Sequence, residues 1–270
     1  MLIEREFWSI EEFMGCEVHP INKNVNCVKS KFFFRLSSNK KWLGCDSPND
    51  VDRLVHEGWP EGVERAIAIR DRIVYSLPPP KTLRKRKVHG DFGDEVDIQK
   101  IYSGDWDRAW TKTQREMVTG MPVIRILTSF AANCDKSADA MFYKGVTAAI
   151  LTDILEARGY RVEVVIYSHV QGVYTNGDSS YCQLMVKDSK EPLDLSRLIV
   201  TTALSGFFRY HWFKYAVSLP ILAFDSLGRT LESPVSKYEK EKDIVISDIY
   251  SEHEAVNMIK NVLKSLEERK

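Results

Sequence analysis

Two loops of the sequence collect oxygen-bearing side chains directly after apolar segments. The first begins at the end of residues 122–130 and holds Thr128, Ser129, Asn133, Asp135 and Ser137. The second follows residues 218–224 and holds Asp225 and Ser226. A hard divalent cation takes oxygen ligands and usually at least one carboxylate. We therefore expect either a weak Mg²⁺ site formed by Ser129, Asn133 and Asp225, or a polar loop that only caps a helix over residues 138–158; no other cofactor is expected.

The first loop also contains a cysteine, Cys134, ahead of the expected helix. A helix N-terminus lowers the pKa of a thiol, so a thiol enzyme with His169 as general base is one hypothesis. No third group that would orient His169 is evident, and the G-x-G-x-x-G, Walker, G-x-S-x-G and H-E-x-x-H motifs are missing. We therefore assign no catalytic residue and rank a metal- or thiol-dependent enzyme last among the function classes.

A run of basic residues follows three consecutive prolines at positions 78–80. Five of the seven residues from 81 to 87 are basic: Lys81, Arg84, Lys85, Arg86 and Lys87. Such a run would contact phosphates if it formed an arm. A solvated linker, neutralised by the acidic residues that follow, is the favoured alternative, because no aromatic residue is interleaved with the basic ones as is usual in proteins that bind single strands.

The most unusual local composition is FFRYHWFKY, residues 207–215, in which six of nine residues are aromatic. Exposed on the surface, Phe208, Arg209, His211 and Trp212 would form a docking surface for a partner protein or a stacking platform for bases. The favoured alternative is a core helix with its aromatic residues directed inward and its cations directed outward.

The composition of the whole chain is that of an ordinary globular protein. Its 270 residues include 38 basic and 38 acidic side chains, so the formal net charge is zero. This balance argues against binding nucleic acid or membranes with the whole surface, although a local patch is able to do so. No segment approaches the ~18 apolar residues of a membrane span, and the acidic N-terminus differs from a signal peptide. Five cysteines without a CxxC pair predict reduced thiols. We expect a cytoplasmic protein that does not bind membranes.

Hydrophobic periodicity divides the chain into a smaller α+β region with a basic linker, residues 1–93, and a larger α/β region, residues 94–270. In the larger region, strand patterns cover residues 122–130, 161–168, 181–188, 218–224 and 243–246, and helices are expected over 106–117, 139–158, 193–216 and 252–270. This alternation predicts a three-layer, Rossmann-like α/β fold with a mostly parallel sheet covered on both faces. A turn at Asn176-Gly177 predicts one antiparallel edge strand. Ligands of such sheets bind beyond the carboxyl ends of the strands, where the two polar loops lie.

This order of elements resembles that of von Willebrand factor A-like domains. RVEVVIYS (161–168) is similar to their second strand, and PILAFDS (220–226) to the strand that ends in a conserved aspartate, here Asp225. The resemblance implies a Mg²⁺ site built from Asp-x-Ser-x-Ser after the first strand, a threonine and that aspartate. This sequence departs from the pattern, because Thr128-Ser129-Phe130-Ala131-Ala132-Asn133 lacks the aspartate and the second serine. The threonine would be Thr201 or Thr202.

Other segments resemble a family of tailed-phage proteins of unknown function. They are GWPEG (58–62), GDEVDIQKIYSGDWDRAW (93–110), YKGVTAAILTDILEARGYRVEV (143–164) and DIVISDIY (243–250) with the helix after it. The resemblance covers most of residues 47–268. It implies a phage-encoded protein in the host cytoplasm and carries no activity with it.

These observations favour a non-enzymatic adaptor that docks a phage or host protein. The expected contact residues are Thr128, Ser129, Asn133, Asp135 and Asp225, with Phe208, Arg209, His211 and Trp212 as a second surface. The alternative is a nucleic-acid-associated protein of phage replication or transcription that uses the basic run from Lys81 to Lys87.

Overall fold

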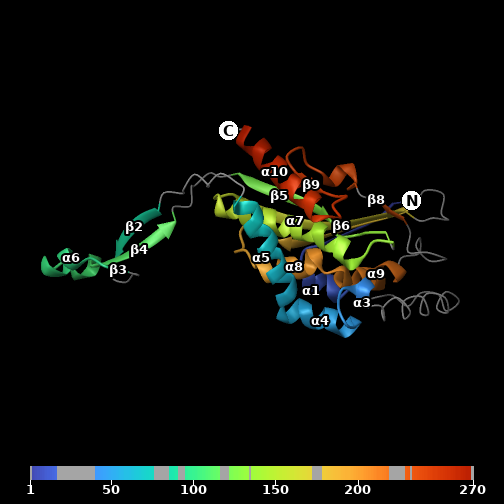
Figure 1. The fold of residues 1–270 in the computed structure, drawn as a ribbon, viewed down its shortest axis with the longest axis horizontal. Helices are drawn as coiled ribbons and strands as arrows, with labels where there is room; N and C mark the ends of the chain where they lie inside the picture. Colours follow the sequence, from blue (N-terminus) through green and yellow to red (C-terminus); the bar gives the residue numbers. More distant parts are fainter. Residues whose placement is uncertain are drawn as a thin grey trace.

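The computed structural model describes residues 2–16, 40–75, 85–90, 95–115, 122–133, 135–171, 178–218, 229–231 and 233–268. In Figure 1 they form a main α/β body and a small antiparallel arm. The strands of the body are β1 (Leu2–Phe7), β5 (Val123–Ser129), β6 (Arg161–Gln171), β7 (Ser179–Lys187), β8 (Arg229–Leu231) and β9 (Ile244–Ile246). Its helices are α1 (Ile10–Met14), α3 (Lys40–Leu43), α4 (Pro48–Glu57), α5 (Pro60–Tyr75), α7 (Ala138–Ala157), α8 (Leu195–Ala203), α9 (Phe213–Ser218) and α10 (Glu252–Glu268).

The strands of the body form one sheet in the order β1-β7-β6-β5-β9. β1 runs parallel to β7, while β6 and β9 both run parallel to β5. β7 is antiparallel to β6, as the sequence predicts for residues 181–188, but it is not the predicted edge strand, because β1 pairs with its other side. β8 pairs antiparallel with the end of β6. The α/β class with a mostly parallel sheet flanked by helices is therefore confirmed.

The crossover from β5 to β6 is the long helix α7. Its sequence is apolar on all sides, and most of its residues are buried, as expected for a helix inside a fold. Ser137 caps its first turn by accepting a hydrogen bond from the Ala140 N–H at 3.1 Å. Gly159 follows the last turn with φ +90°, a conformation that glycine adopts without strain. Local chemistry thus sets both ends of this helix close to where the sequence places them.

Two layers of helices lie on one face of the sheet. α7, α8 and α10 share a buried cluster with strand residues such as Ile126 and Val164. α4 and α5 pack outside them, against α7 and α8. The inner helices approach closely at Gly145, where a Cβ atom would lie 2.0 Å from the Thr202 carbonyl oxygen. Only glycine allows this spacing, so Gly145 fixes how α8 sits on α7.

The opposite face of the sheet is covered, in the described chain, by residues around the 3₁₀ turn η4 (Ser236–Tyr238). Tyr181 stacks between Tyr167 and Tyr238, with ring centroids 6.0 and 4.6 Å away. Arg125 donates a hydrogen bond of 2.9 Å to the Tyr238 carbonyl. A short segment held by stacking and hydrogen bonds therefore covers this side, while the helices cover the other.

The structure does not divide the chain into two regions at residue 93 as predicted, because elements from before this residue pack into the α/β body. β1 pairs with β7 along its whole length, although more than 170 residues separate them. α4 and α5 pack on α7 and α8. The described residues within 2–75 and 122–268 thus share one layered body.

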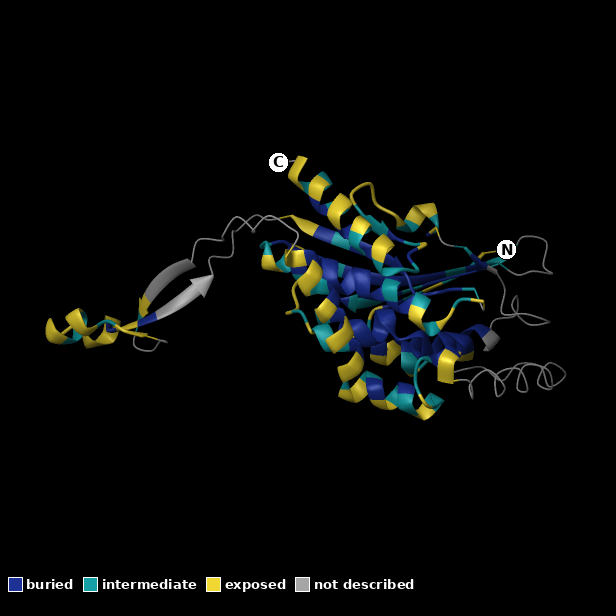
Figure 2. Ribbon diagram, in the orientation of Figure 1, coloured by how far each residue is buried: buried dark blue, intermediate teal, exposed yellow. Residues whose placement is uncertain are grey.

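The arm consists of residues 85–90 and 95–115. Its strands β2 (Lys85–Gly90), β4 (Trp110–Arg115) and β3 (Glu95–Val96) form a separate antiparallel sheet in that order. Between β3 and β4 lie α6 (Ile98–Tyr102) and the 3₁₀ turn η1 (Trp106–Arg108). In Figure 2 most of α6 and η1, which form the tip of the arm, has the colour of exposed residues. The helix predicted over residues 106–117 is wrong, because pairing with β2 draws its second half into a strand.

Candidate functional site

The predicted contact residues at the end of β5 are not on the surface. Thr128 and Ser129 are each only 1% exposed. The Ser129 hydroxyl donates to the Ala131 carbonyl at 3.4 Å, while the Thr128 hydroxyl has no hydrogen-bond partner among the described residues. Their side chains are sealed inside the fold, so the expectation that they touch a partner is wrong.

Farther along the same loop, two predicted residues do reach the surface. Asn133 accepts a hydrogen bond of 3.3 Å from the Thr230 N–H, which joins this loop to β8. Asp135 is exposed and lies 3.7 Å from the Lys136 ammonium group. Asp225, the carboxylate expected opposite them, lies outside the described residues, as do Ser226 and Cys134.

The ligands expected for Mg²⁺ are therefore only partly described. In the described ranges, no three His, Cys, Asp or Glu side chains come together as a metal site would require. Thr201 and Thr202, the candidates for the threonine ligand, lie inside α8, where their hydroxyls hydrogen-bond to the Leu198 carbonyl at 3.1 and 2.7 Å. These hydroxyls stabilise the helix and are not directed to the loop after β5.

Two buried cations, Lys144 and Arg209, hold the loop after β5 in place. Neither of them was assigned this role from the sequence. Lys144, 1% exposed within α7, donates to the Ala131 carbonyl at 2.5 Å. Arg209, 2% exposed, donates to the carbonyls of Lys136, at 2.5 Å, and Trp42. Both cations bind backbone carbonyls, so they fix the path of the loop; no sequence signal marks this role, because the carbonyls belong to distant segments.

The aromatic segment forms the π-helix η2 (Phe207–Trp212) and the start of α9, and it is buried. Phe208 and Trp212 stack on each other at 5.0 Å within the core, as the favoured alternative predicts. The prediction that the cations point outward is wrong for Arg209 and His211, which are 2% and 5% exposed. Burial lowers the pKa of His211 to about 4, with a smaller contribution from the Lys214 charge, so the ring is neutral at pH 7. None of the four predicted residues therefore offers a docking surface.

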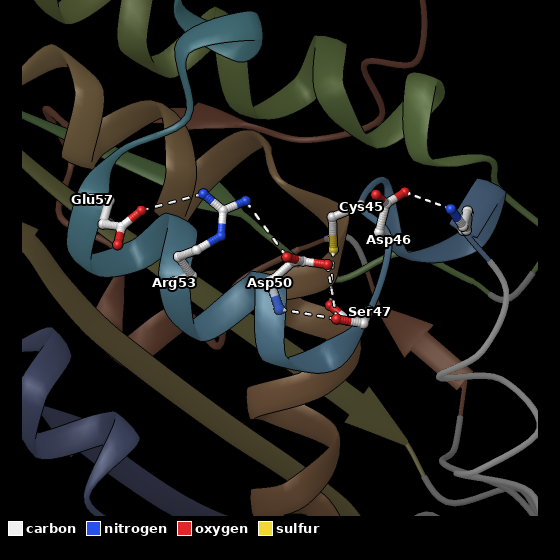
Figure 3. A network of polar contacts seen from close by, with 7 residues as sticks. Cys45, Asp46, Ser47, Asp50, Arg53 and Glu57 are labelled. Atoms are coloured by element: carbon white, nitrogen blue, oxygen red, sulfur yellow. Dashed lines mark hydrogen bonds and ion pairs between the residues drawn. The ribbon is translucent and has the colours of Figure 1, made fainter.

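A cleft of about 480 Å³ lies beside the N-terminus of α7. Lys40 and Arg65 line it, but each is paired at 2.8 Å with a carboxylate, Asp46 and Asp139 respectively. Cys45 also lines the cleft, and desolvation by burial raises the pKa of its thiol to about 11. Figure 3 shows Cys45 above the capping residues of α4, where its thiol donates to the Ser47 carbonyl at 3.4 Å. The protonated thiol is a poor nucleophile, and two of the cations that line the cleft, Lys40 and Arg65, are already paired with carboxylates.

His169, the other half of the hypothetical thiol pair, lies on β6. Its Nδ1 is 3.0 Å from the Ser233 carbonyl, and its ring meets Tyr181 edge-on. It therefore contributes to the packing around η4. Its relation to Cys134 falls outside the described residues.

The arm concentrates positive charge on one pair of strands. β2 reads KRKVHG and β4 reads WTKTQR, so the twelve paired residues contain five Lys and Arg and no Asp or Glu. Lys85 lies directly opposite Arg115, and Lys112 opposite Val88. Three members of the predicted basic run, Lys85 to Lys87, are thus in β2, whereas Lys81 and Arg84 lie outside the described residues.

The same pairing brings aromatic residues to the basic strands. Trp110 begins β4 and lies opposite Gly90 of β2, although 20 positions separate them in the sequence. Trp106 is on η1, which contacts both β2 and β4. The objection from the sequence, that no aromatic residue accompanies the basic run, therefore does not apply to the folded arm. A search for a second strand able to pair with residues 85–90 would have suggested this arrangement.

The fold and the arm together define a mixed α/β protein with a basic, aromatic antiparallel extension. The chain belongs to the family described as "Domain of unknown function (DUF7192)", whose model matches residues 2–269. No curated protein and no solved structure matches the chain. Among the helices that the structure describes, none has the length and apolar character needed to cross a bilayer.

Proposed function

We propose that this protein is a non-enzymatic nucleic-acid-binding protein that uses its arm, residues 85–90 and 95–115, to hold the phosphate backbone. The observation that carries the proposal is the β2–β4 pair, with five Lys and Arg and no acidic residue in two paired strands. Like charges placed opposite each other destabilise a strand pair. The phosphates of a nucleic acid would neutralise the basic residues and so remove this repulsion. Their binding would also release the counterions condensed on the nucleic acid, which favours the complex.

The neutral net charge of the chain fits a local rather than a global electrostatic contact. We include in the proposal the phage origin and the cytoplasmic location that the sequence resemblance implies, with a role in phage replication or transcription. The degenerate von Willebrand factor A-like domain would then be the body that carries the arm.

The test is a salt titration of oligonucleotide binding by the full chain, followed by fluorescence anisotropy. The triple variant Lys85→Glu, Arg86→Glu, Lys87→Glu is compared with a control, Lys242→Glu, Lys260→Glu, Lys264→Glu, which makes the same charge change at exposed positions of the body. We expect the arm variant to lose most of its binding and the slope of log K against log salt to fall by roughly 2. The control should bind as the unmodified protein does. Equal losses in both variants, or binding that does not depend on salt, would contradict the proposal.

A second candidate function is docking of a phage or host protein at the loop after β5. It is favoured by the position of Asn133 and Asp135, which reach the surface in the loop that leads to the N-terminus of α7. Reversing the charge at Asp135 should then abolish co-purification of one specific protein and leave oligonucleotide binding unchanged. Retention of that protein by Asp135→Lys would rule out this docking mode.

A further inference from the structure

The exposed apolar side chains of the protein gather on the arm. Ten large apolar side chains are exposed in the described residues, and five of them belong to the short stretch from 96 to 110: Val96, Ile98, Tyr102, Trp106 and Trp110. The aromatic members are 87%, 64% and 40% exposed. α6, which ends at Tyr102, has no buried residue at all. A fold seldom leaves so many rings in water within one small element unless they meet a ligand.

These rings lie next to the positive charge. η1, which carries Trp106, contacts β2 and β4, and α6 contacts η1. Trp110 is flanked across the sheet by Gly90 on one side and Val96 on the other. Neither residue has a large side chain with which to cover an indole ring. The arm therefore presents aromatic surface at its tip and cationic residues along its strands.

Acidic residues on α6 and η1, the tip of the arm, indicate how a nucleic-acid strand would be oriented on it. Asp105 and Asp107 flank Trp106, and Asp97 caps α6 by accepting hydrogen bonds from the backbone at 3.1 and 3.4 Å. With Lys100 and Arg108, these carboxylates leave residues 97–108 with one more acidic than basic residue, whereas β2 and β4 hold Lys and Arg without Asp or Glu, so phosphate is attracted to the strands and not to the tip. A bound strand would thus lay its backbone along β2 and β4 and direct its bases toward the rings.

We infer that the ligand of the arm is a single-stranded nucleic acid whose unpaired bases stack on Tyr102, Trp106 and Trp110. This inference rests on the proposed function and specifies its ligand. Every base has a π face, so stacking on aromatic rings is tolerant of sequence. In a duplex these faces are covered by neighbouring base pairs, and the exposed rings would find nothing to stack on. A protein partner would use the rings but would not require two paired strands with five Lys and Arg and no acidic residue beside them.

The experiment compares oligo-dT, oligo-U and a hairpin duplex of equal charge as ligands of the full chain. The variants are Trp106→Ala and Trp106→Phe, with Trp8→Ala as control, because Trp8 is 69% exposed but lies in the body next to β1. We expect single strands to bind more tightly than the duplex, and Trp106→Ala to weaken single-strand binding about tenfold or more. Trp106→Phe should retain most of the affinity, and Trp8→Ala all of it. Binding should also quench tryptophan fluorescence less in Trp106→Ala.

The outcomes separate this inference from the proposed function. If Trp106→Ala binds single strands normally while the triple glutamate variant does not, the arm binds phosphate without stacking and the inference fails alone. If neither the unmodified chain nor any variant binds oligonucleotides, the proposed function fails. If Trp106→Ala instead abolishes self-association in sedimentation experiments and leaves oligonucleotide binding intact, the rings form an interface between copies and the inference is overturned.

Discussion

Trp110 of β4 lies directly opposite Gly90 of β2 in the antiparallel pair of the arm. Residues directly opposite each other share one face of a sheet, so a side chain at position 90 would lie against the indole. Glycine leaves that position empty, and the ring is 40% exposed. The register of this strand pair thus determines both where the positive charge gathers and which aromatic surface remains available beside it.

Lys85 and Arg115 also occupy opposite positions in the register of β2 and β4. Because both residue types are basic, a change of charge at position 85 should affect strand pairing and ligand binding in opposite directions. Lys85→Glu places a carboxylate opposite the guanidinium, so β2–β4 pairing should become more stable by about 0.2–1 kcal/mol. The same change should weaken oligonucleotide binding, because a phosphate contact is lost. Amide hydrogen exchange of residues 85–115 measures the first effect and anisotropy the second. Lys85→Gln should give smaller changes of the same signs; a parallel loss of pairing and binding would show that the charge supports the fold rather than a ligand.

The buried hydroxyl of Thr128 should be dispensable for stability. In the part of the chain that the structure describes it has no hydrogen-bond partner, so Thr128→Val replaces an unsatisfied polar atom by a methyl group and should leave the free energy of unfolding unchanged or raise it. Thr202→Val is the matched control, because the Thr202 hydroxyl donates at 2.7 Å to Leu198 and at 3.1 Å to Gly145. The control should lose about 1 kcal/mol in urea denaturation. A loss at Thr128 equal to that at Thr202 would contradict the assignment.

Gly145→Ala should destabilise the protein despite the higher helix propensity of alanine. The gain from propensity is about 1 kcal/mol, whereas a Cβ atom 2.0 Å from the Thr202 carbonyl forces α7 and α8 apart. Overpacking of this kind costs about 1–3 kcal/mol or more, so the net change should be a loss. Chemical denaturation measures it, and Ala157→Ser, at an exposed position of the same helix, should stay within about 0.5 kcal/mol. An unchanged or higher stability of Gly145→Ala would mean that the helices are not in contact there.

The buried His211 should make folding sensitive to mild acid. Its pKa is lowered to about 4 in the folded protein by burial, and then by the charges of Lys214 and His56, against about 6.5 in the unfolded chain. The nearby Asp52 carboxylate, 3.2 Å from Nε2, does not offset the burial. As the pH falls, His211 therefore takes up a proton in the unfolded chain before it does so in the folded protein. The free energy of unfolding is unaffected by this residue above about pH 6.5 and decreases as the pH falls toward 4. The total loss is about 3 kcal/mol.

Urea denaturation between pH 7 and 4.5 checks this dependence. His211→Gln should flatten the part of the curve below pH 6.5, whereas the exposed His253→Gln should follow the unmodified protein. An identical pH dependence in all three proteins would assign the acid sensitivity to other groups.

Several elements could be predicted because their determinants are local. Ser137 and Gly159 mark the ends of α7, and the apolar residues between them recur at helical spacing. β5 and β6 are runs of apolar, β-branched residues that suit buried parallel strands. The strand expected over residues 218–224 lies almost wholly outside the described residues, so that prediction stays open.

The orientation of the polar residues could not be predicted, since it depends on distant partners. Arg209 points inward because the carbonyls of Trp42 and Lys136 converge on it. Thr128 and Ser129 lie inside because helices and η4 cover the two faces of the sheet at their positions. Sequence spacing contains no information about such contacts.

The sequence by itself determined the α/β class, the central helix and the presence of a basic run, because hydrophobic period, caps and charge are properties of short segments. Only the tertiary structure decided that residues 110–115 form a strand instead of a helix, that Trp110 meets the basic strand, and that the aromatic segment 207–215 belongs to the core. Each of these depends on free-energy gains from pairing or burial between residues far apart in the chain, which outweigh local preference.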